Sequence, residues 1–192
     1  GYITTFEIIP GETYSVVRTT GFPAAEYDDL LTCFARNTRI QTEVGNVPIQ
    51  NIELGMRVWT KGNGLQEVMW IGSTTVSGFG LYAPIRICKT ALGNSRALRV
   101  SPQHKMLIRG WRSELLFRCE EVLLSAKALI NGQTIFREST NKIEYWHLMF
   151  TQHEIIFAEG CPAESFFLTA ESCRAQGTDA QAELARLFPQ IT

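Results

Sequence analysis

The chain has 192 residues, of which 45% are hydrophobic, so it can bury a full hydrophobic core without disulfides or metals to stabilise it. Its acidic and basic residues are interspersed and sum to a net charge of −1, which argues against nucleic acid as a partner. No apolar run approaches the length of a membrane span, and no signal-peptide pattern opens the sequence, so we expect no membrane partner. We also expect a monomer.

The first 32 residues differ in character from the rest of the chain. Turn-forming Pro and Gly residues at 10–11 and 21–23, with an acidic patch at 26–29, favour short extended pieces and turns. We interpret residues 1–32 as a flanking segment. Because the sequence begins with Gly1 rather than Met, we expect a module of a longer protein, whose localisation, secretion included, stays open.

From Phe34 onward the sequence predicts one short strand after another. Two hairpins are expected, with turns around Gly45 and around Gly62. Further strands are predicted at residues 84–89, 97–100, 105–108, 133–138, 143–150 and 153–158. This many short strands with little helical periodicity between them indicates an all-β body.

Two segments depart from this pattern. Residues 114–130 fit either a strand that leads into one helical turn at "SAKAL" or a short helix throughout. Near the end of the chain, Thr178 and Asp179 precede an amphipathic run, which predicts an N-capped helix over about 179–188 that packs on its own domain.

The five cysteines are too sparse for a disulfide framework, and their odd number leaves at least one free thiol. We expect Cys88, Cys119 and Cys173 to be small buried hydrophobic residues. The cysteines and the three histidines lack the spacing of structural zinc ligands, so we expect neither a metal nor a cofactor.

Cys33 is the first candidate for chemistry, because cysteine is the strongest nucleophile available and all three histidines lie downstream of it. That order also suits a cysteine hydrolase. However, Cys33 begins an extended run, whereas a papain-like nucleophile heads a helix that lowers its pKa.

Two histidine segments could assist it. In "RVSPQHKML", Ser101 can turn its hydroxyl toward His104 or a nearby amide, although a structural histidine fits this pattern as well. In "EYWHLMF", strand alternation places His147 among apolar neighbours, where burial favours the neutral, proton-accepting imidazole or a hydrogen-bonded core histidine. His153, at the next turn, is interpreted as structural rather than reactive.

Taken in this order, the three stretches resemble the Hint superfamily, the self-processing module of Hedgehog C-terminal domains, inteins and bacterial intein-like domains. "CFARNTRIQTEVGNVPIQNIELGMRVWT" is similar to the amino-terminal block, "VSPQHKMLI" to the T-x-x-H block with Ser101 in place of Thr, and "YWHLMFTQHEIIFAEG" to the late block. The resemblance is nearest to the bacterial Hedgehog/intein branch. It implies a compact, horseshoe-like, pseudo-twofold β fold over 33–167, with 168–192 as a C-terminal extension.

The resemblance also implies roles for named residues. The thiol of Cys33 would attack the carbonyl of Thr32 and turn the peptide bond into a thioester. His104 would hydrogen-bond the scissile amide and protonate its nitrogen, Ser101 would orient the site, and His147 would deprotonate Cys33 or relay its proton.

The chain departs from splicing inteins after its late block. It continues "CPAESFF" and contains no His-Asn, so the resemblance implies cleavage by water, a thiol or an amine without full splicing. Cys161 could receive only a branched intermediate. Two alternatives stay open: a processing-inactive Hint fold that serves as a binding or spacer module, and an unrelated β-rich cysteine hydrolase.

Overall fold

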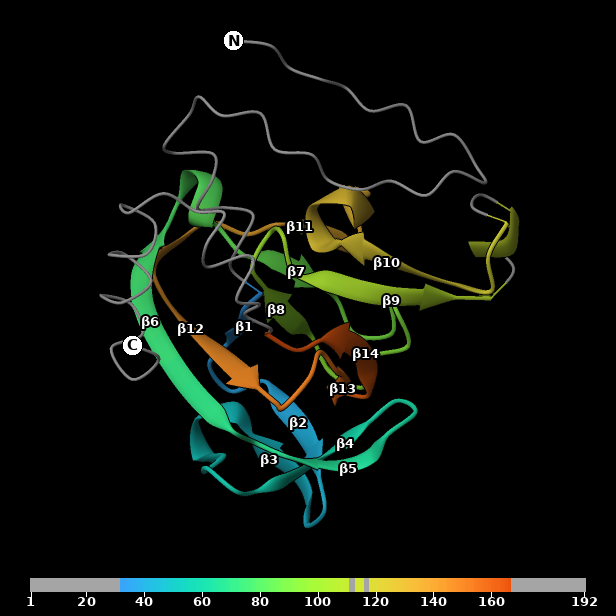
Figure 1. The fold of residues 1–192 in the computed structure, drawn as a ribbon. Helices are drawn as coiled ribbons and strands as arrows, with labels where there is room; N and C mark the ends of the chain where they lie inside the picture. The colour runs from blue at the N-terminus through green and yellow to red at the C-terminus, as the bar shows by residue number, and fades with distance from the viewer. Residues whose placement is uncertain (1–31, 111–112, 116–117, 167–192) are drawn as a thin grey trace, which may run out of the picture.

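The computed structural model describes residues 32–110, 113–115 and 118–166 (Figure 1). Strands dominate this part of the chain and form two sheets, so the all-β prediction is confirmed. No described residue belongs to a helix long and apolar enough to cross a membrane. The predicted flank before Thr32 and the predicted helix at 179–188 lie outside the described residues.

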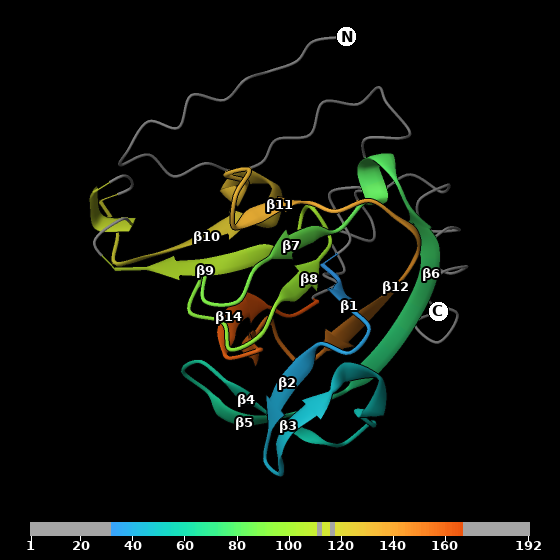
Figure 2. The same ribbon diagram turned by 180° about the vertical axis from the view of Figure 1, so that it is seen from behind.

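The first sheet has six strands and carries the amino-terminal end of the described chain. Its strand order is β11 (Ile135–Arg137), β7 (Ile85–Ile87), β8 (Leu98–Val100), β1 (Phe34–Ala35), β12 (Thr140–Met149) and β6 (Trp70–Gly78). Neighbouring strands pair antiparallel. β6 and β12 form a long, curved ribbon along one side of the molecule (Figures 1 and 2).

The second sheet has eight strands. The order is β10 (Glu121–Ser125), β9 (Lys105–Arg109), β14 (Cys161–Glu164), β13 (Ile155–Ala158), β2 (Arg39–Thr42), β4 (Arg57–Thr60) and β5 (Gly64–Glu67), and β3 (Gly45–Pro48) pairs with β2. In β2 and β4 exposed and buried residues alternate, because one face of each strand packs on the core. Short 3-10 turns are found at η1 (Ile49–Asn51), η2 (Gly80–Tyr82) and η3 (Ala126–Leu129).

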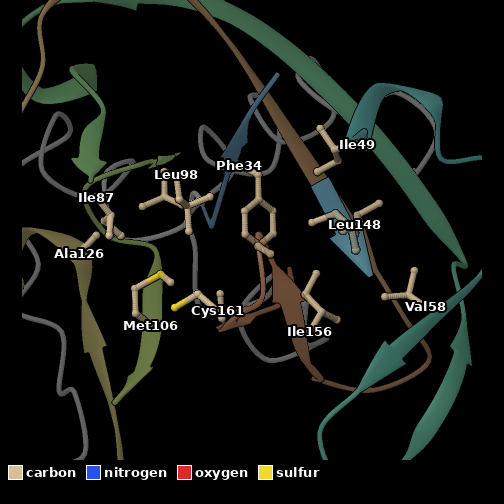
Figure 3. Close-up of a cluster of buried hydrophobic side chains, with 14 of the residues drawn as sticks. Phe34, Ile49, Val58, Ile87, Leu98, Met106, Ala126, Leu148, Ile156 and Cys161 are labelled. Atoms are coloured by element: carbon tan, nitrogen blue, oxygen red, sulfur yellow. The ribbon is translucent and has the colours of Figure 1, made fainter. Parts of the chain in front are cut away.

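The main hydrophobic core draws side chains from both sheets (Figure 3). Phe34 and Leu148 of the first sheet and Ile156 and Met106 of the second are fully or almost fully buried in it. A second, smaller cluster of buried residues consists of Cys33, Ala35, Ile143 and Tyr145. β12 contributes to both clusters, because successive side chains of a strand point to opposite faces. Phe34 packs in the main core, and its neighbour Cys33 therefore points to the opposite face, into the smaller cluster.

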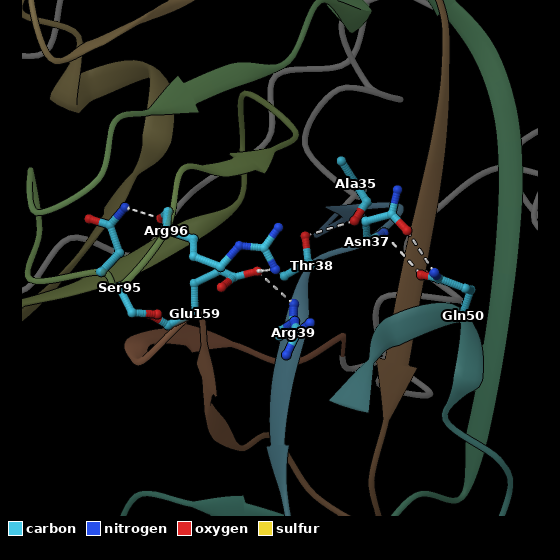
Figure 4. A network of polar contacts seen from close by, with 9 residues as sticks. Ala35, Asn37, Thr38, Arg39, Gln50, Ser95, Arg96 and Glu159 are labelled. Carbon is cyan, nitrogen blue, oxygen red and sulfur yellow. Dashed lines mark hydrogen bonds and ion pairs between the residues drawn. The ribbon is translucent and has the colours of Figure 1, made fainter. Parts of the chain in front are cut away.

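A polar network fixes the corner between β1 and β2 (Figure 4). Asn37 takes a left-handed backbone conformation with φ of 70°, and its side-chain oxygen accepts a hydrogen bond from Gln50 at 2.8 Å. The Thr38 hydroxyl donates to the carbonyl of Ala35 at 2.7 Å. Glu159 accepts from the backbone N–H of Arg39 at 2.9 Å. These bonds hold the short strand β1, and with it Cys33, in a fixed register.

The structure settles several predictions about single elements. Residues 114–130 contain strand β10 followed by the turn η3, so the first of the two interpretations is correct. Both predicted hairpins form, and all six further strands are found, whereas β6 and β14 are additional strands that the pattern does not predict. Cys88 is only half-buried and Cys119 is exposed, so the prediction that Cys119 is buried is wrong. Cys173 lies outside the described residues.

Candidate active site around Cys33

Strand register brings Cys33 next to two of the predicted site residues. Phe34 pairs with Val100 of β8 on one side and with Trp146 of β12 on the other. One step back along the antiparallel ladders, Cys33 therefore lies beside Ser101 and His147. These residues are far apart in sequence, and β1 between β8 and β12 is what joins them.

Ser101 holds both backbone polar groups of Cys33. The backbone N–H of Cys33 donates to Ser101 Oγ at 3.1 Å, and the backbone N–H of Ser101 donates to the Cys33 carbonyl at 3.0 Å. The predicted contact of His104 with the scissile amide is not found here, because Ser101 fills that position. Cys33 and Ser101 are both buried, so each bond replaces one that water would otherwise make.

His147 contacts both the thiol of Cys33 and the carbonyl group of Thr32. Its Nε2 atom lies 3.3 Å from the Cys33 sulfur, and its Nδ1 atom lies 2.9 Å from the carbonyl oxygen of Thr32. A carbonyl can only accept, so we assign the ring proton to Nδ1, which donates to Thr32, and the lone pair to Nε2. The thiol of Cys33 then donates to that lone pair.

His104 reaches the same dipeptide through a tight turn. Its backbone N–H donates to the Ser101 carbonyl at 3.1 Å, with Pro102 at the turn position that its ring favours. The turn directs His104 Nδ1 to the Cys33 carbonyl oxygen at 3.0 Å. The buried Nε2 of His104 has no hydrogen-bond partner among the described residues.

Aromatic rings surround both imidazoles. Phe34 meets His104 edge-on with ring centroids 4.3 Å apart, and Phe166 meets His147 in the same manner at 5.4 Å. The ring of Trp70 lies 6.5 Å from that of His147. Gly72 is paired with His147 across the ladder, and a Cβ atom there would come within 2.3 Å of the Trp70 ring. Glycine at this position therefore makes room for the indole beside the site.

This enclosure controls the charge state of the site. Burial lowers the pKa of His147 to about 4, while its bond to Thr32 acts in the opposite direction. Burial also lowers the pKa of His104 to about 4, against the opposing effect of nearby Glu164. Burial raises the pKa of the Cys33 thiol well above its usual range, and a hydrogen bond with Ser101 offsets only part of this. All three groups are therefore neutral at pH 7.

Glu164, at the end of β14, is a site residue that the sequence did not reveal. Its Oε1 atom accepts a hydrogen bond from the Thr32 hydroxyl at 3.0 Å. His153 Nε2 lies 3.4 Å from Oε2 of the same carboxylate, which places the half-exposed His153 one contact away from Thr32. The signal available in the sequence is an acidic residue within an otherwise apolar stretch, but the pattern there does not predict strand β14 itself.

Cys161 lies apart from this group. It packs in the main hydrophobic core, its sulfur contacts the Leu92 carbonyl at 3.7 Å, and burial raises the pKa of its thiol to about 11. Cys33 and Cys161 are both free thiols. Within the described ranges, no three His, Cys, Asp or Glu side chains are grouped to hold a metal ion.

A small cavity of about 20 Å³ adjoins Cys33. Its walls are mostly apolar and come from Cys33, Thr74, Val76, Tyr82, Ser101, Pro102 and Tyr145. This volume is about that of one water molecule. The space next to the thiol therefore has room for about one water molecule.

Comparisons with known proteins identify the family and the fold. Residues 32–170 match the Hint domain family. The solved bacterial intein-like domain from Clostridium thermocellum is similar in structure, with a TM-score of 0.51 and 11% identity over 71% of this chain and 99% of that chain. A DnaB intein from Synechocystis sp. PCC 6803 gives a TM-score of 0.44 and 12% identity over 70% and 99% of the two chains. A search of curated proteins found no match. The chain therefore belongs to the Hint domain family, a fold that supports self-processing and that it shares with a bacterial intein-like domain.

Proposed function

We propose that the chain is a single-turnover self-processing domain that cuts its own peptide bond between Thr32 and Cys33. The sulfur of Cys33 attacks the Thr32 carbonyl carbon, and the acyl group moves from nitrogen to sulfur. The observation that carries this proposal is the position of His147, which contacts the attacking sulfur and the oxygen of the attacked carbonyl at 3.3 and 2.9 Å.

The first step requires a base, because the buried thiol of Cys33 is protonated at neutral pH. Neutral His147 offers its Nε2 lone pair to that thiol. With a pKa of about 4 it is a weak base, so a separated thiolate–imidazolium pair is unfavourable in the resting site. Proton transfer therefore accompanies carbon–sulfur bond formation instead of preceding it.

The same imidazole stabilises the charge that develops on the carbonyl oxygen of Thr32. Its Nδ1–H already points at that oxygen, and taking up the thiol proton makes the ring cationic when the oxygen becomes negative. A prearranged donor at a developing oxyanion in a water-poor site is worth far more than in water. His147 therefore acts as base and oxyanion donor together.

The nitrogen of Cys33 must gain a proton when its bond to Thr32 breaks. The imidazolium of His147 holds the thiol proton and is a strong acid, so we assign the return of this proton to His147, as one histidine does in other acyl transfers. The thiol proton then ends on the new amine, and the rearrangement neither consumes nor releases a proton. Ser101 orients the amide meanwhile, and His104 holds the Cys33 carbonyl.

The thioester is then cleaved by water, a thiol or an amine. Each nucleophile forms a bond to the Thr32 carbonyl carbon and returns the sulfur of Cys33 as a thiol. The small cavity beside Cys33 has about the volume of one water molecule, so among these nucleophiles it favours water. The late block is followed directly by Cys161, and the sequence contains no His-Asn pair, which supports cleavage without the cyclisation step of protein splicing.

Intact mass spectrometry of the purified chain at neutral pH tests the proposal. We expect a fragment that ends at Thr32 to accumulate, faster with dithiothreitol or hydroxylamine, because these reagents attack a thioester. Cys33→Ala removes the nucleophile and should give no fragment. Cys161→Ala is the matched control, because it removes another buried cysteine outside the site.

A parent mass that never changes under native, reducing conditions would overturn self-processing and leave an inactive Hint fold that serves as a binding or spacer module. Turnover of an added labelled peptide at many equivalents would instead indicate a cysteine hydrolase.

A further inference from the structure

Residue 32 is held by its side chain as well as by its carbonyl. The Thr32 hydroxyl donates to Glu164 Oε1 at 3.0 Å, while its carbonyl accepts from His147 at 2.9 Å. Two contacts to different groups of one residue fix the direction of its carbonyl. Fixing that direction relative to an attacking atom contributes strongly to the rate of an intramolecular reaction.

The receiving carboxylate is built into the sheet. The side chain of Glu164 is only 8% exposed, and its Oε1 atom also accepts from the backbone N–H of Lys105 on β9 at 2.9 Å. Its Oε2 atom faces His153 Nε2 at 3.4 Å and Lys105 Nζ at 3.8 Å. Glu164 is therefore held in place by contacts that do not depend on residue 32.

Glu164 is a charged acceptor at neutral pH. Burial by itself would raise its pKa, but the hydrogen bond with His153 and the neighbouring His104 and Lys105 outweigh burial, so the pKa lies below its usual value. A buried carboxylate that loses one donor keeps the cost of its desolvation. Such a site rejects a residue 32 that lacks a donor much more strongly than it rejects a small change of shape.

We propose that Glu164 determines which residue can precede the nucleophile, and that it selects a hydroxyl side chain, Thr or Ser, at position 32. This inference rests on the proposed self-cleavage at Cys33. It assigns Glu164 a positioning role: the carboxylate acts on the reaction through residue 32 and touches none of the reacting atoms.

The test measures the rate of dithiothreitol-induced cleavage in chains that differ at position 32. Thr32→Val has nearly the same shape without a donor, and we expect it to cleave roughly 10- to 100-fold more slowly, the range for a hydrogen bond to a charged group. Thr32→Ser keeps the donor and should cleave within about threefold of the parent, since its hydroxyl makes the same bond. Equal rates for the parent and Thr32→Val would overturn the proposal.

A second pair separates this role from a purely structural one. In Glu164→Ala the absolute rate is expected to fall, but adding Thr32→Val to that variant should change the rate by a factor of only about one, since no acceptor remains to select. Glu164→Gln keeps a neutral acceptor, so adding Thr32→Val to it should change the rate by an intermediate factor. This variant replaces Glu164→Ala in the test if the Ala variant does not fold. If Thr32→Val slows cleavage as much in both Glu164 variants as in the parent, Glu164 is not the source of the selectivity.

Failure of the proposed function has a distinct signature. If the parent chain does not cleave at all, the selectivity proposal fails with it, and the four combinations of Thr32→Val and Glu164→Ala are compared in the Cys33→Ala background by thermal unfolding. Non-additive melting temperatures would show that Glu164 still binds the hydroxyl in a fold that does not process itself. Additive melting temperatures would show that the contact between Glu164 and the hydroxyl contributes nothing to the fold either.

Discussion

The Nε2 atom of His147 lies 3.3 Å from the sulfur of Cys33, although 114 positions separate the two residues in sequence. Both are fully buried. Because burial lowers the pKa of the imidazole to about 4 and raises that of the thiol, the pair rests in its neutral form. A buried, protonated thiol is a poor nucleophile toward external reagents. The same imidazole, however, also contacts the carbonyl oxygen of the preceding residue at 2.9 Å.

His147→Gln is expected to slow thioester formation by about 10²- to 10⁴-fold, the usual contribution of general acid–base assistance. Glutamine can still donate to the Thr32 carbonyl but cannot take a proton from Cys33. The measurement is the rate of fragment release with dithiothreitol, with circular dichroism as the control for folding. A folded His147→Gln protein that cleaves at the parent rate would contradict the assignment of His147 as the base.

Ser101→Ala leaves the buried N–H of Cys33 without its acceptor, which costs on the order of 1–3 kcal/mol. We expect a lower midpoint in urea unfolding and slower cleavage. Ser101→Thr is the matched control, because it keeps a hydroxyl at the same position and should retain both properties. A Ser101→Ala protein with the unfolding midpoint and cleavage rate of the parent would contradict this role of the Ser101 hydroxyl.

The two buried histidines make the fold sensitive to mild acid. Their pKa is about 4 in the folded chain against an ordinary value of 6.5, so between these limits the unfolded chain binds more protons. The free energy of unfolding therefore falls as the pH drops from about 6.5 to 4, by up to about 1.4 kcal/mol per pH unit for each histidine. Urea titrations of Cys33→Ala measure this slope.

Replacing one histidine in that protein, for example His104→Gln, should remove one histidine's share of the slope. An unchanged slope would mean that the ring is already protonated, or already solvated, in the folded state.

The four described cysteines differ in accessibility, which thiol labelling can resolve. Cys119 is exposed and should react first with iodoacetamide under native conditions. Cys33 and Cys161 are buried with raised pKa values, and their labelling should require unfolding. Peptide mapping after a timed pulse gives the order. Rapid native labelling of Cys161 would show that the main core opens more readily than its packing implies.

Cys161→Ala is expected to cleave at the parent rate, because its sulfur lies in the main core and contacts the Leu92 carbonyl rather than the groups around Thr32. Loss of the buried sulfur should lower stability by on the order of 1 kcal/mol through the cavity it leaves. Slower fragment release without a matching loss of stability would instead support a role for Cys161 as an acceptor thiol.

Local pattern in the sequence by itself determined much of this protein. Alternating exposed and buried positions in β2 and β4, and the glycines at the hairpin turns, are enough to predict short antiparallel strands. The type and order of the candidate residues, Cys33 first and His104 and His147 later, also lie in the sequence, and with them the resemblance to Hint domains. Strand patterns depend on neighbouring residues, and the type and order of residues are written along the chain, which is why the sequence alone reveals them.

The contacts around Cys33 depend on the tertiary structure. The register of β1 between β8 and β12 places Cys33 beside Ser101 and His147, and it gives the scissile N–H to Ser101 rather than to His104. Glu164 reaches Thr32 only because β14 pairs with β9 and β13, and no local pattern in the sequence encodes that pairing. Long-range strand register follows from packing the whole core at once, so contacts between distant strands cannot be derived from the periodicity of either strand.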